Sequence, residues 1–138
     1  MPGTDQSGPL IAPDAATIEA YARAALAGLP APFAAHLDNV VLLVEELADD
    51  ETLDALGIAD PFELTGVYHG RPLGEKSSLD SGALPDRIHL YRRAILDEWI
   101  DTGVALNALV AHVLVHEVGH HFGLSDDDMH ALEDTVTD

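Results

Sequence analysis

The sequence predicts an α+β fold in which a small mixed β-sheet packs against helices. Residues 14–29 and 104–121 carry apolar side chains at helical spacing, whereas residues 39–47 and 88–96 contain short apolar or alternating runs typical of strands. Helices and strands in this order favour an α+β arrangement. The connections are too short for a doubly wound sheet.

The first half of the chain has clear start and stop signals. Residues 1–13 are rich in Gly, Pro and small polar residues, which predicts a flexible tail before a single domain at 14–138. The helix at 14–29 ends at Gly28 and Pro30. The run NVVLLVEEL at 39–47 has a continuous apolar centre and is interpreted as a buried strand.

Shorter elements are expected to follow. Residues 51–56 predict a short helix ended by Gly57. Residues 64–73 mix strand-forming residues with Gly and Pro, which indicates a short strand with a turn, and residues 74–85 are loop-like. Alternation at 88–96 predicts a strand that places Ile88, Leu90, Arg92 and Ala94 on one face.

The apolar residues of 104–121 nearly encircle the predicted helix, which indicates that it is central and buried. Gly123 is expected to end this helix. Ser125 is a candidate N-cap for a last helix that runs to about Glu133, with acidic residues in its first turn.

The charge of the chain limits the kinds of partner it can have. Six Lys and Arg residues stand against 25 Asp and Glu residues, for a formal net charge of −19. Nucleic acids and anionic membranes both require a basic surface, so neither is an expected partner. The simpler interpretation of the charge is solubility, and the alternative is an attraction for cationic peptides.

No segment of the sequence predicts export or membrane insertion. The residues from Met1 to Ser7 have neither the basic nor the apolar region of a secretory signal, and no apolar run is long enough to span a bilayer. A cytoplasmic location is therefore expected. Oligomeric state is left open. The absence of cysteine means that a metal must be held by His, Asp or Glu.

The segment with the clearest chemistry is His-Glu-x-x-His, formed by His116, Glu117 and His120. Two histidines four residues apart on a helix lie on one face, about one turn from each other, and can bind one ion. Glu117 is rotated by ~100° from His116 and can therefore lie beside the metal, where a base for metal-bound water is needed.

A catalytic zinc site needs a third protein ligand and an open position. Gly123 can turn the chain sharply, and Asp126 follows three residues later. The pattern is therefore His-Glu-x-x-His-x-x-Gly-x-x-Asp. Asp126 is the predicted third ligand, with Asp127, Asp128 and His130 as weaker candidates. One zinc ion per chain is expected.

For the other polar residues that are singled out, the simpler interpretation is a structural role. His112 and His121 are expected to pack or to orient a ligand, and His130 to orient an aspartate or to lie on the surface. Arg92 and Arg93 are expected to balance nearby acidic charge. The aromatic candidates for stabilising an oxyanion are each more simply explained by strand packing; they are Tyr68, His69, His89 and Tyr91.

The motif resembles that of the zincin metallopeptidases, and residues 36–134 are similar to the short bacterial zincin-like proteins called minimal metalloproteases. The resemblance also rests on Gly66-Val67-Tyr68-His69-Gly70 and on the segment from Leu84 to Arg93. It implies a sheet packed on the active-site helix, His116, His120 and Asp126 as metal ligands, and Glu117 as base. Met129 follows Asp126 too closely for the methionine turn of larger relatives.

The predicted function is zinc-dependent hydrolysis of peptide bonds. In this interpretation Glu117 takes a proton from the zinc-bound water and passes it to the leaving amine. The substrate would be a peptide or protein, lying extended beside the strand predicted at 88–96. The alternative is a zinc-stabilised binding or regulatory module with little turnover, which would have no need of an uncoordinated carboxylate at position 117.

Overall fold

The computed structural model describes residues 11–31, 33, 37, 40–70 and 86–137, and at residues 126 and 135–137 it describes the backbone alone. The helices are α1 (Ala15–Ala27), α3 (Asp50–Leu56), α4 (Arg92–Thr102), α5 (Leu106–Phe122) and α6 (Asp126–Thr137), with a 3-10 turn η1 at Pro61–Glu63. The strands are β1 (Val41–Glu45), β2 (Gly66–His69) and β3 (Arg87–Tyr91).

The three strands form a mixed sheet in the order β1-β3-β2. β1 runs parallel to β3, with Leu42 opposite Ile88, and β2 runs antiparallel to β3, with Gly66 opposite Leu90. This confirms the predicted α+β class with a small mixed sheet. The central position of β3 has a consequence for substrate binding. Because β3 is paired on both edges, the expectation that a peptide pairs with it is wrong.

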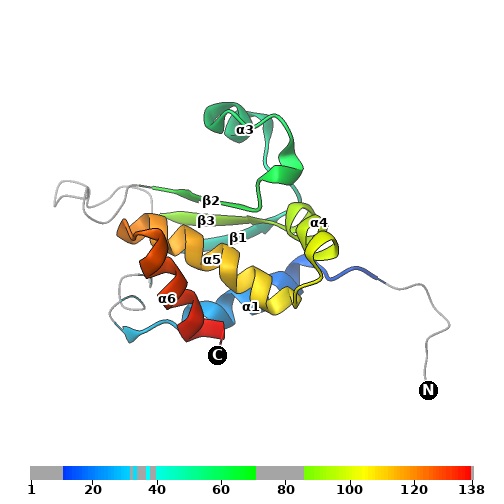
Figure 1. Cartoon of the computed structure of the whole chain (residues 1–138). Coiled ribbons are helices and arrows are strands. Elements are labelled where there is room, and N and C mark those ends of the chain that lie inside the picture. Colours follow the sequence, from blue (N-terminus) through cyan, green and yellow to red (C-terminus); the bar gives the residue numbers. More distant parts are fainter. Residues whose placement is uncertain (1–10, 32, 34–36, 38–39, 71–85, 138) are drawn as a thin grey trace, which may run out of the picture.

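The main core lies between the sheet and helices α1 and α5, which Figure 1 shows on the face of the sheet opposite α3. Ile88 and Leu90 point into this core and are fully buried, as are Val110 and Leu114 of α5. A smaller cluster under α3 contains Leu53, Tyr91 and Ala94, together with Ala48. Helix α6 packs along α5 on the side away from the strands.

Several helix ends follow from the residues that the sequence places there. The Asp14 side chain accepts a hydrogen bond from the Thr17 N–H and caps α1. Gly57 ends α3 in the left-handed conformation, with φ of 69°. At the last helix, Ser125 Oγ accepts from the Asp128 N–H at 3.2 Å, as predicted, and α6 continues past Glu133 to Thr137.

The strand predicted at 88–96 is wrong beyond Tyr91. The strand is Arg87–Tyr91, and α4 begins at Arg92. Ala94, Ile95 and Leu96 are consecutive buried residues, a pattern that a helix packed on two sides produces and that a strand with one buried face does not. Arg92 and Ala94 therefore do not share a strand face with Ile88 and Leu90.

The strand predicted at 39–47 is shorter and less buried than expected. β1 spans Val41–Glu45, and within it only Leu42 is buried. Val41 is 38% exposed because β1 is an outer strand of the sheet and its second face is only partly covered. Residues 38–39, 71–85 and most of the predicted tail lie outside the described part of the chain.

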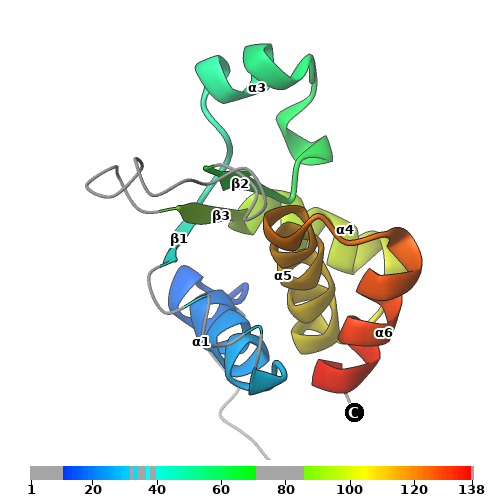
Figure 2. The same ribbon diagram turned by 90° about the vertical axis from the view of Figure 1, so that its left-hand side faces the viewer.

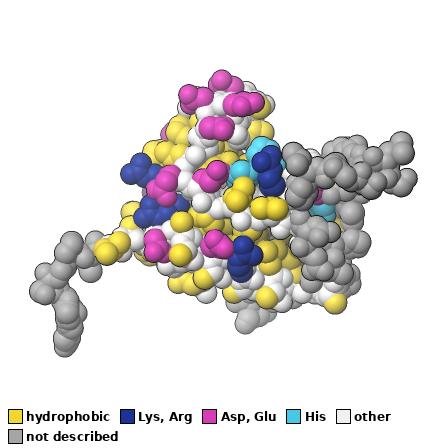
Figure 3. Space-filling view, turned by 180° about the vertical axis from the view of Figure 1, so that it is seen from behind, with side chains coloured by type: hydrophobic (Ala, Val, Ile, Leu, Met, Phe, Trp, Pro, Cys, Tyr) yellow, Lys and Arg dark blue, Asp and Glu magenta, His cyan; other side chains and the backbone are white. Residues whose placement is uncertain are grey.

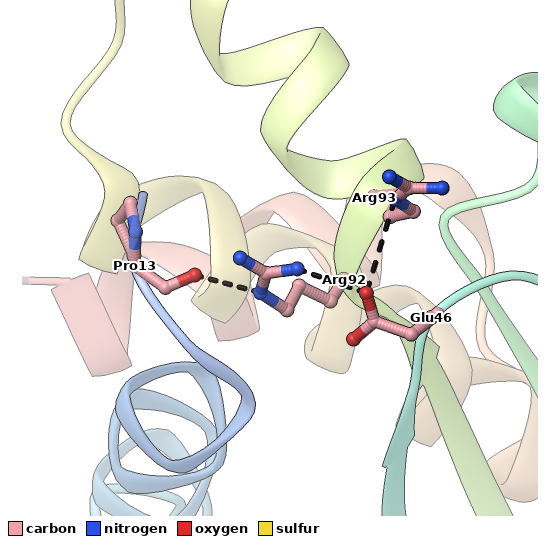
Figure 4. A network of polar contacts seen from close by, with 4 residues as sticks. All are labelled: Pro13, Glu46, Arg92 and Arg93. Atoms are coloured by element: carbon pink, nitrogen blue, oxygen red, sulfur yellow. Dashed lines mark hydrogen bonds and ion pairs between the residues drawn. The ribbon is translucent and has the colours of Figure 1, made fainter. Parts of the chain in front are cut away.

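The first residues of α4 hold the N-terminal segment and β1 together (Figure 4). Arg92 donates from Nε to the Pro13 carbonyl at 2.7 Å and from Nη1 to Glu46 at 2.9 Å, and Arg93 Nε lies 3.9 Å from the same carboxylate. The two arginines therefore balance acidic charge, as predicted. Elsewhere on this side of the molecule, acidic side chains gather at the end that carries α3 (Figure 3).

None of the described helices has the length and apolar character needed to cross a membrane.

Candidate metal centre

Helix α5 carries the His-Glu-x-x-His segment on its last two turns. The helix ends at Gly123, whose φ of 67° lies in the left-handed region that favours glycine. The Gly123 N–H bonds back to the carbonyls of Gly119 and His120. The chain then turns at once into α6, so the segment stands where α5, α6 and the sheet meet (Figure 2).

The two histidines face outward and the glutamate faces inward. His116 is half-buried, whereas the His120 side chain is 60% exposed and the Glu117 side chain is 9% exposed. Glu117 Oε1 lies 3.6 Å from His120 Nδ1. Glu117 therefore points into the protein while His120 is exposed, and the binding of one ion by His116 and His120 stays a prediction.

Glu117 is buried with its charge only partly compensated. The Tyr68 backbone N–H donates a hydrogen bond to its carboxylate, but Oε1 has no hydrogen-bond partner among the described residues. Burial raises the pKa of Glu117 to about 7. A buried, incompletely bonded carboxylate costs free energy, which makes Glu117 a candidate functional residue.

The predicted third ligand begins the next helix. Asp126 is the first residue of α6, but its side chain lies outside the described part. The alternatives Asp127, Asp128 and His130 are all exposed. No three histidine or carboxylate side chains within the described part are arranged to hold a metal. The choice among these ligands therefore stays a prediction.

A model of the zincin-like metallopeptidase family matches residues 37–136, which is most of the chain and includes the whole segment described above. The chain belongs to this family. A comparison with curated proteins found no match.

The residues present fit the zinc ion that zincin-like metallopeptidases bind. Imidazole nitrogens and carboxylate oxygens are suitable zinc ligands, and His116 and His120 would provide the first two. Beside them, Glu117 Oε1 is a buried oxygen whose hydrogen bonding is incomplete among the described residues. That oxygen is explained if a water held at the site donates to it.

A buried polar network ties the edge strand to the end of this zincin-like helix. The Tyr68 hydroxyl donates a hydrogen bond to Asp86, and His121 Nδ1 lies 2.6 Å from the hydroxyl oxygen and 3.2 Å from Asp86 Oδ2. His121 is 1% exposed and Asp86 is 8% exposed. Burial and the neighbouring Asp86 raise the pKa of Tyr68, which keeps the phenol neutral.

This network positions Glu117 through the backbone of Tyr68. The side chain of Tyr68 is held by Asp86 and His121, while its N–H reaches the Glu117 carboxylate. His121 is therefore a buried packing residue, as predicted. The Tyr68 hydroxyl is engaged in the network, which makes it a poor candidate for stabilising an oxyanion.

The other aromatic candidates pack on the opposite face of the sheet, although Tyr91 lies near Glu117: burial raises the pKa of the Tyr91 phenol, and nearby carboxylates, Glu117 among them, raise it further. His69, His89 and Tyr91 point to the face of the sheet that carries α3, because they alternate with the core residues of β2 and β3. His89 Nδ1 lies 2.6 Å from Glu45 Oε1, and its ring packs edge-on against His69 at 4.8 Å between centroids. Strand packing explains these residues, as predicted.

His112 extends the row of histidines by one turn. Its ring packs against that of His116, with 4.9 Å between centroids, and its Nδ1 lies 2.6 Å from Glu133 Oε1 on α6. A carboxylate on one ring nitrogen fixes the tautomer of a histidine, so Glu133 orients His112 and limits how the neighbouring His116 ring can turn.

Sequence reasoning missed Asp86, Glu98 and Glu133. Asp86 and Glu133 meet histidines that are far from them in sequence, and Glu98 lines a pocket with His116 and Glu117. Glu133 lay within the helix predicted at the end of the chain. Its spacing of four residues from Met129 puts the two on one helical face, and this was the only sequence signal for its position. No local pattern marks Asp86 or Glu98.

Gly119, inside the motif, allows α6 to approach α5 closely. A Cβ at this position would lie 2.2 Å from Met129 Sδ and 2.6 Å from its Cγ. Met129 is 8% exposed and is part of the main core. Met129 therefore packs directly beneath the metal motif.

Gly119→Ala is expected to destabilise the zinc-free protein by ~1–2 kcal/mol and to weaken zinc binding. Overpacking costs ~1–3 kcal/mol, which exceeds the gain of up to ~1 kcal/mol from alanine's helix propensity. Denaturant unfolding and a zinc competition titration measure the two effects. In a Met129→Ala background the same change should be neutral or stabilising, because the clashing side chain is absent. Equal stability of Gly119→Ala and wild type would contradict this account of the packing.

Proposed function

We propose that this member of the zincin-like family is a zinc-dependent peptidase in which Glu117 is the general base. The observation that carries the proposal is the buried Glu117 carboxylate beside two histidines of one helical face, with Oε1 lacking a hydrogen bond among the described residues. A purely structural zinc site has no use for such a carboxylate.

Three side chains of this chain would hold the ion: His116, His120 and Asp126. When bound, zinc polarises the scissile carbonyl and lowers the pKa of a water molecule. Glu117 takes a proton from the attacking water and returns it to the leaving amine. The Tyr68 N–H holds the carboxylate in place, because Tyr68 itself is held by Asp86 and His121.

The sheet suggests where a peptide substrate would lie. β3 has partners on both edges, whereas β2 is an outer strand whose Tyr68 N–H reaches Glu117. An extended peptide is therefore expected along the outer side of β2, near the histidines, instead of along β3.

Protein purified without affinity-tag metal is expected to contain about one zinc per chain, because a three-ligand site with one open position holds a single ion. Plasma emission spectrometry measures the stoichiometry. Removal of the zinc with a chelator should lower the melting temperature, and added zinc should restore it, since a ligand that binds only the folded state stabilises it. Protein that lacks zinc and also fails to bind added zinc would contradict the proposed function.

A further inference from the structure

Two pockets adjoin His116 on α5: one is lined by residues of α5 and α6, and the other by residues of α4 and α5 together with Thr65. One, of about 230 Å³, contains both His116 and Glu117 in its lining, together with Glu98 of α4. A neighbouring pocket of about 250 Å³ shares Glu98 and His112 with the first and reaches Glu133 of α6. Together these two pockets extend from the proposed catalytic residues toward the N-terminal end of α5, and they are called the cleft below.

The walls of this cleft combine apolar side chains and carboxylates with histidines and threonines. Val104, Ala108 and Leu109 supply apolar surface in the pocket that is farther from Glu117. The acidic groups are the carboxylates of Glu98, Glu117 and Glu133, and neither lysine nor arginine lines either pocket in the described part. A cleft with apolar walls and carboxylates matches a side chain that has an aliphatic stem and a cationic end.

The three carboxylates differ in how far each is already paired with other groups. Glu133 Oε1 is 2.6 Å from His112 Nδ1, so part of its charge is engaged. The Glu98 side chain is half-buried and has no hydrogen bond or ion pair with any described residue. Near it, Glu117 is more than nine-tenths buried and its Oε1 has no hydrogen-bond partner among the described residues. Incompletely paired carboxylates at a cleft favour a cationic ligand, because pairing removes the cost of partial desolvation.

We infer that the cleft beside His116 and Glu117 selects peptides with a lysine or arginine side chain close to the scissile bond, and that Glu98 is the main residue that recognises the cation. This inference rests on the proposed function. The formal net charge of −19 works in the same direction, because it speeds the approach of cationic peptides at low ionic strength. The charge of the chain thus gains a second role beside solubility.

The experiment compares three peptides that are identical except for one residue next to the scissile bond, which is lysine, norleucine or glutamate. Norleucine keeps the aliphatic stem and lacks the charge. For the wild-type, zinc-loaded protein, kcat/KM is expected to be higher for the lysine peptide than for the norleucine peptide by about 10-fold, the scale of one charge-assisted hydrogen bond. This preference should shrink between about 50 mM and about 500 mM salt as screening increases.

Variants at position 98 test the assignment of the recognition residue. Glu98→Gln is expected to reduce the lysine-to-norleucine ratio by about 10-fold, and Glu98→Lys to favour the glutamate peptide over the lysine peptide. Glu51→Gln on α3 is the matched control, since it removes one exposed negative charge far from the cleft, and it should leave all three ratios unchanged. An unchanged ratio in Glu98→Gln, or a wild-type preference for norleucine, would overturn the inference.

A binding measurement separates this inference from the proposed function. Fluorescence anisotropy with labelled forms of the three peptides reports affinity whether or not they are cleaved. Tighter binding of the lysine peptide that depends on Glu98, with no cleavage of any peptide, would support the recognition of cations and contradict the peptidase. Cleavage of all three peptides at the same rate, with equal affinities, would support the peptidase and overturn the recognition of cations.

Discussion

Glu117→Gln is expected to lower peptide hydrolysis by ~10²-fold or more while zinc content stays at about one ion per chain. Glutamine keeps the size and shape of the side chain and can still accept the Tyr68 N–H through its amide oxygen. It cannot take a proton from water. The loss should therefore fall on turnover and leave metal binding and melting temperature nearly unchanged.

The measurement is mass spectrometry of a mixed peptide library after incubation with equal amounts of zinc-loaded wild type and variant. Glu51→Gln serves again as the control for the loss of one negative charge at a distant, exposed site. Cleavage that persists undiminished in Glu117→Gln would show that the activity belongs to a contaminating protease. If neither protein cleaves any peptide in a broad library, the result favours the zinc-stabilised binding module.

The site residues that were predictable from the sequence are those with local spacing. His116, Glu117 and His120 are placed by one helix, and the end of that helix is set by Gly123. Helical geometry alone turns Glu117 away from the histidines, and the structure has Glu117 buried and His120 exposed. The family resemblance rested on this same segment, and the family match confirms it.

The residues that support the site depend on contacts between distant parts of the chain. Tyr68 is 18 residues from Asp86 and 53 residues from His121 in sequence, yet the three side chains meet in one buried network. Nothing in the local pattern around Asp86 distinguishes it from a surface aspartate at the start of a strand. The local pattern around Glu98 is equally uninformative, because Glu98 belongs to a helix that the sequence did not predict.

Helix α4 shows why the pattern at 88–96 wrongly predicted a strand beyond Tyr91. Both a strand and a helix can place apolar residues at short spacing, and the segment is too short for period alone to decide between them. Helix α4 starts directly at the end of β3, with no loop and no side-chain cap at Tyr91. Tertiary packing of Ala94 and Ile95 against two neighbouring layers stabilises the helix where the sequence has no start signal.

His116→Ala and His120→Ala are each expected to weaken zinc binding by more than ~100-fold, since each removes one of three protein ligands. Asp126→Ala should also weaken zinc binding strongly, but less than either histidine substitution does, because two imidazoles on one helical face remain. A competition titration against a chromogenic chelator measures the affinity, and plasma emission spectrometry measures the zinc retained on purification. Tight binding that survives the loss of either histidine would contradict the assigned site.

Asp127→Ala is the matched control for Asp126→Ala, because both residues lie in the first turn of α6. A carboxylate there stabilises the helix by ~0.3–1 kcal/mol through the helix dipole, and both substitutions lose that contribution. A drop in zinc affinity confined to Asp126→Ala therefore reports loss of a ligand and not fraying of the helix. If Asp127→Ala loses zinc and Asp126→Ala binds it as wild type does, the third ligand is Asp127 and the turn after Gly123 presents the next residue to the ion.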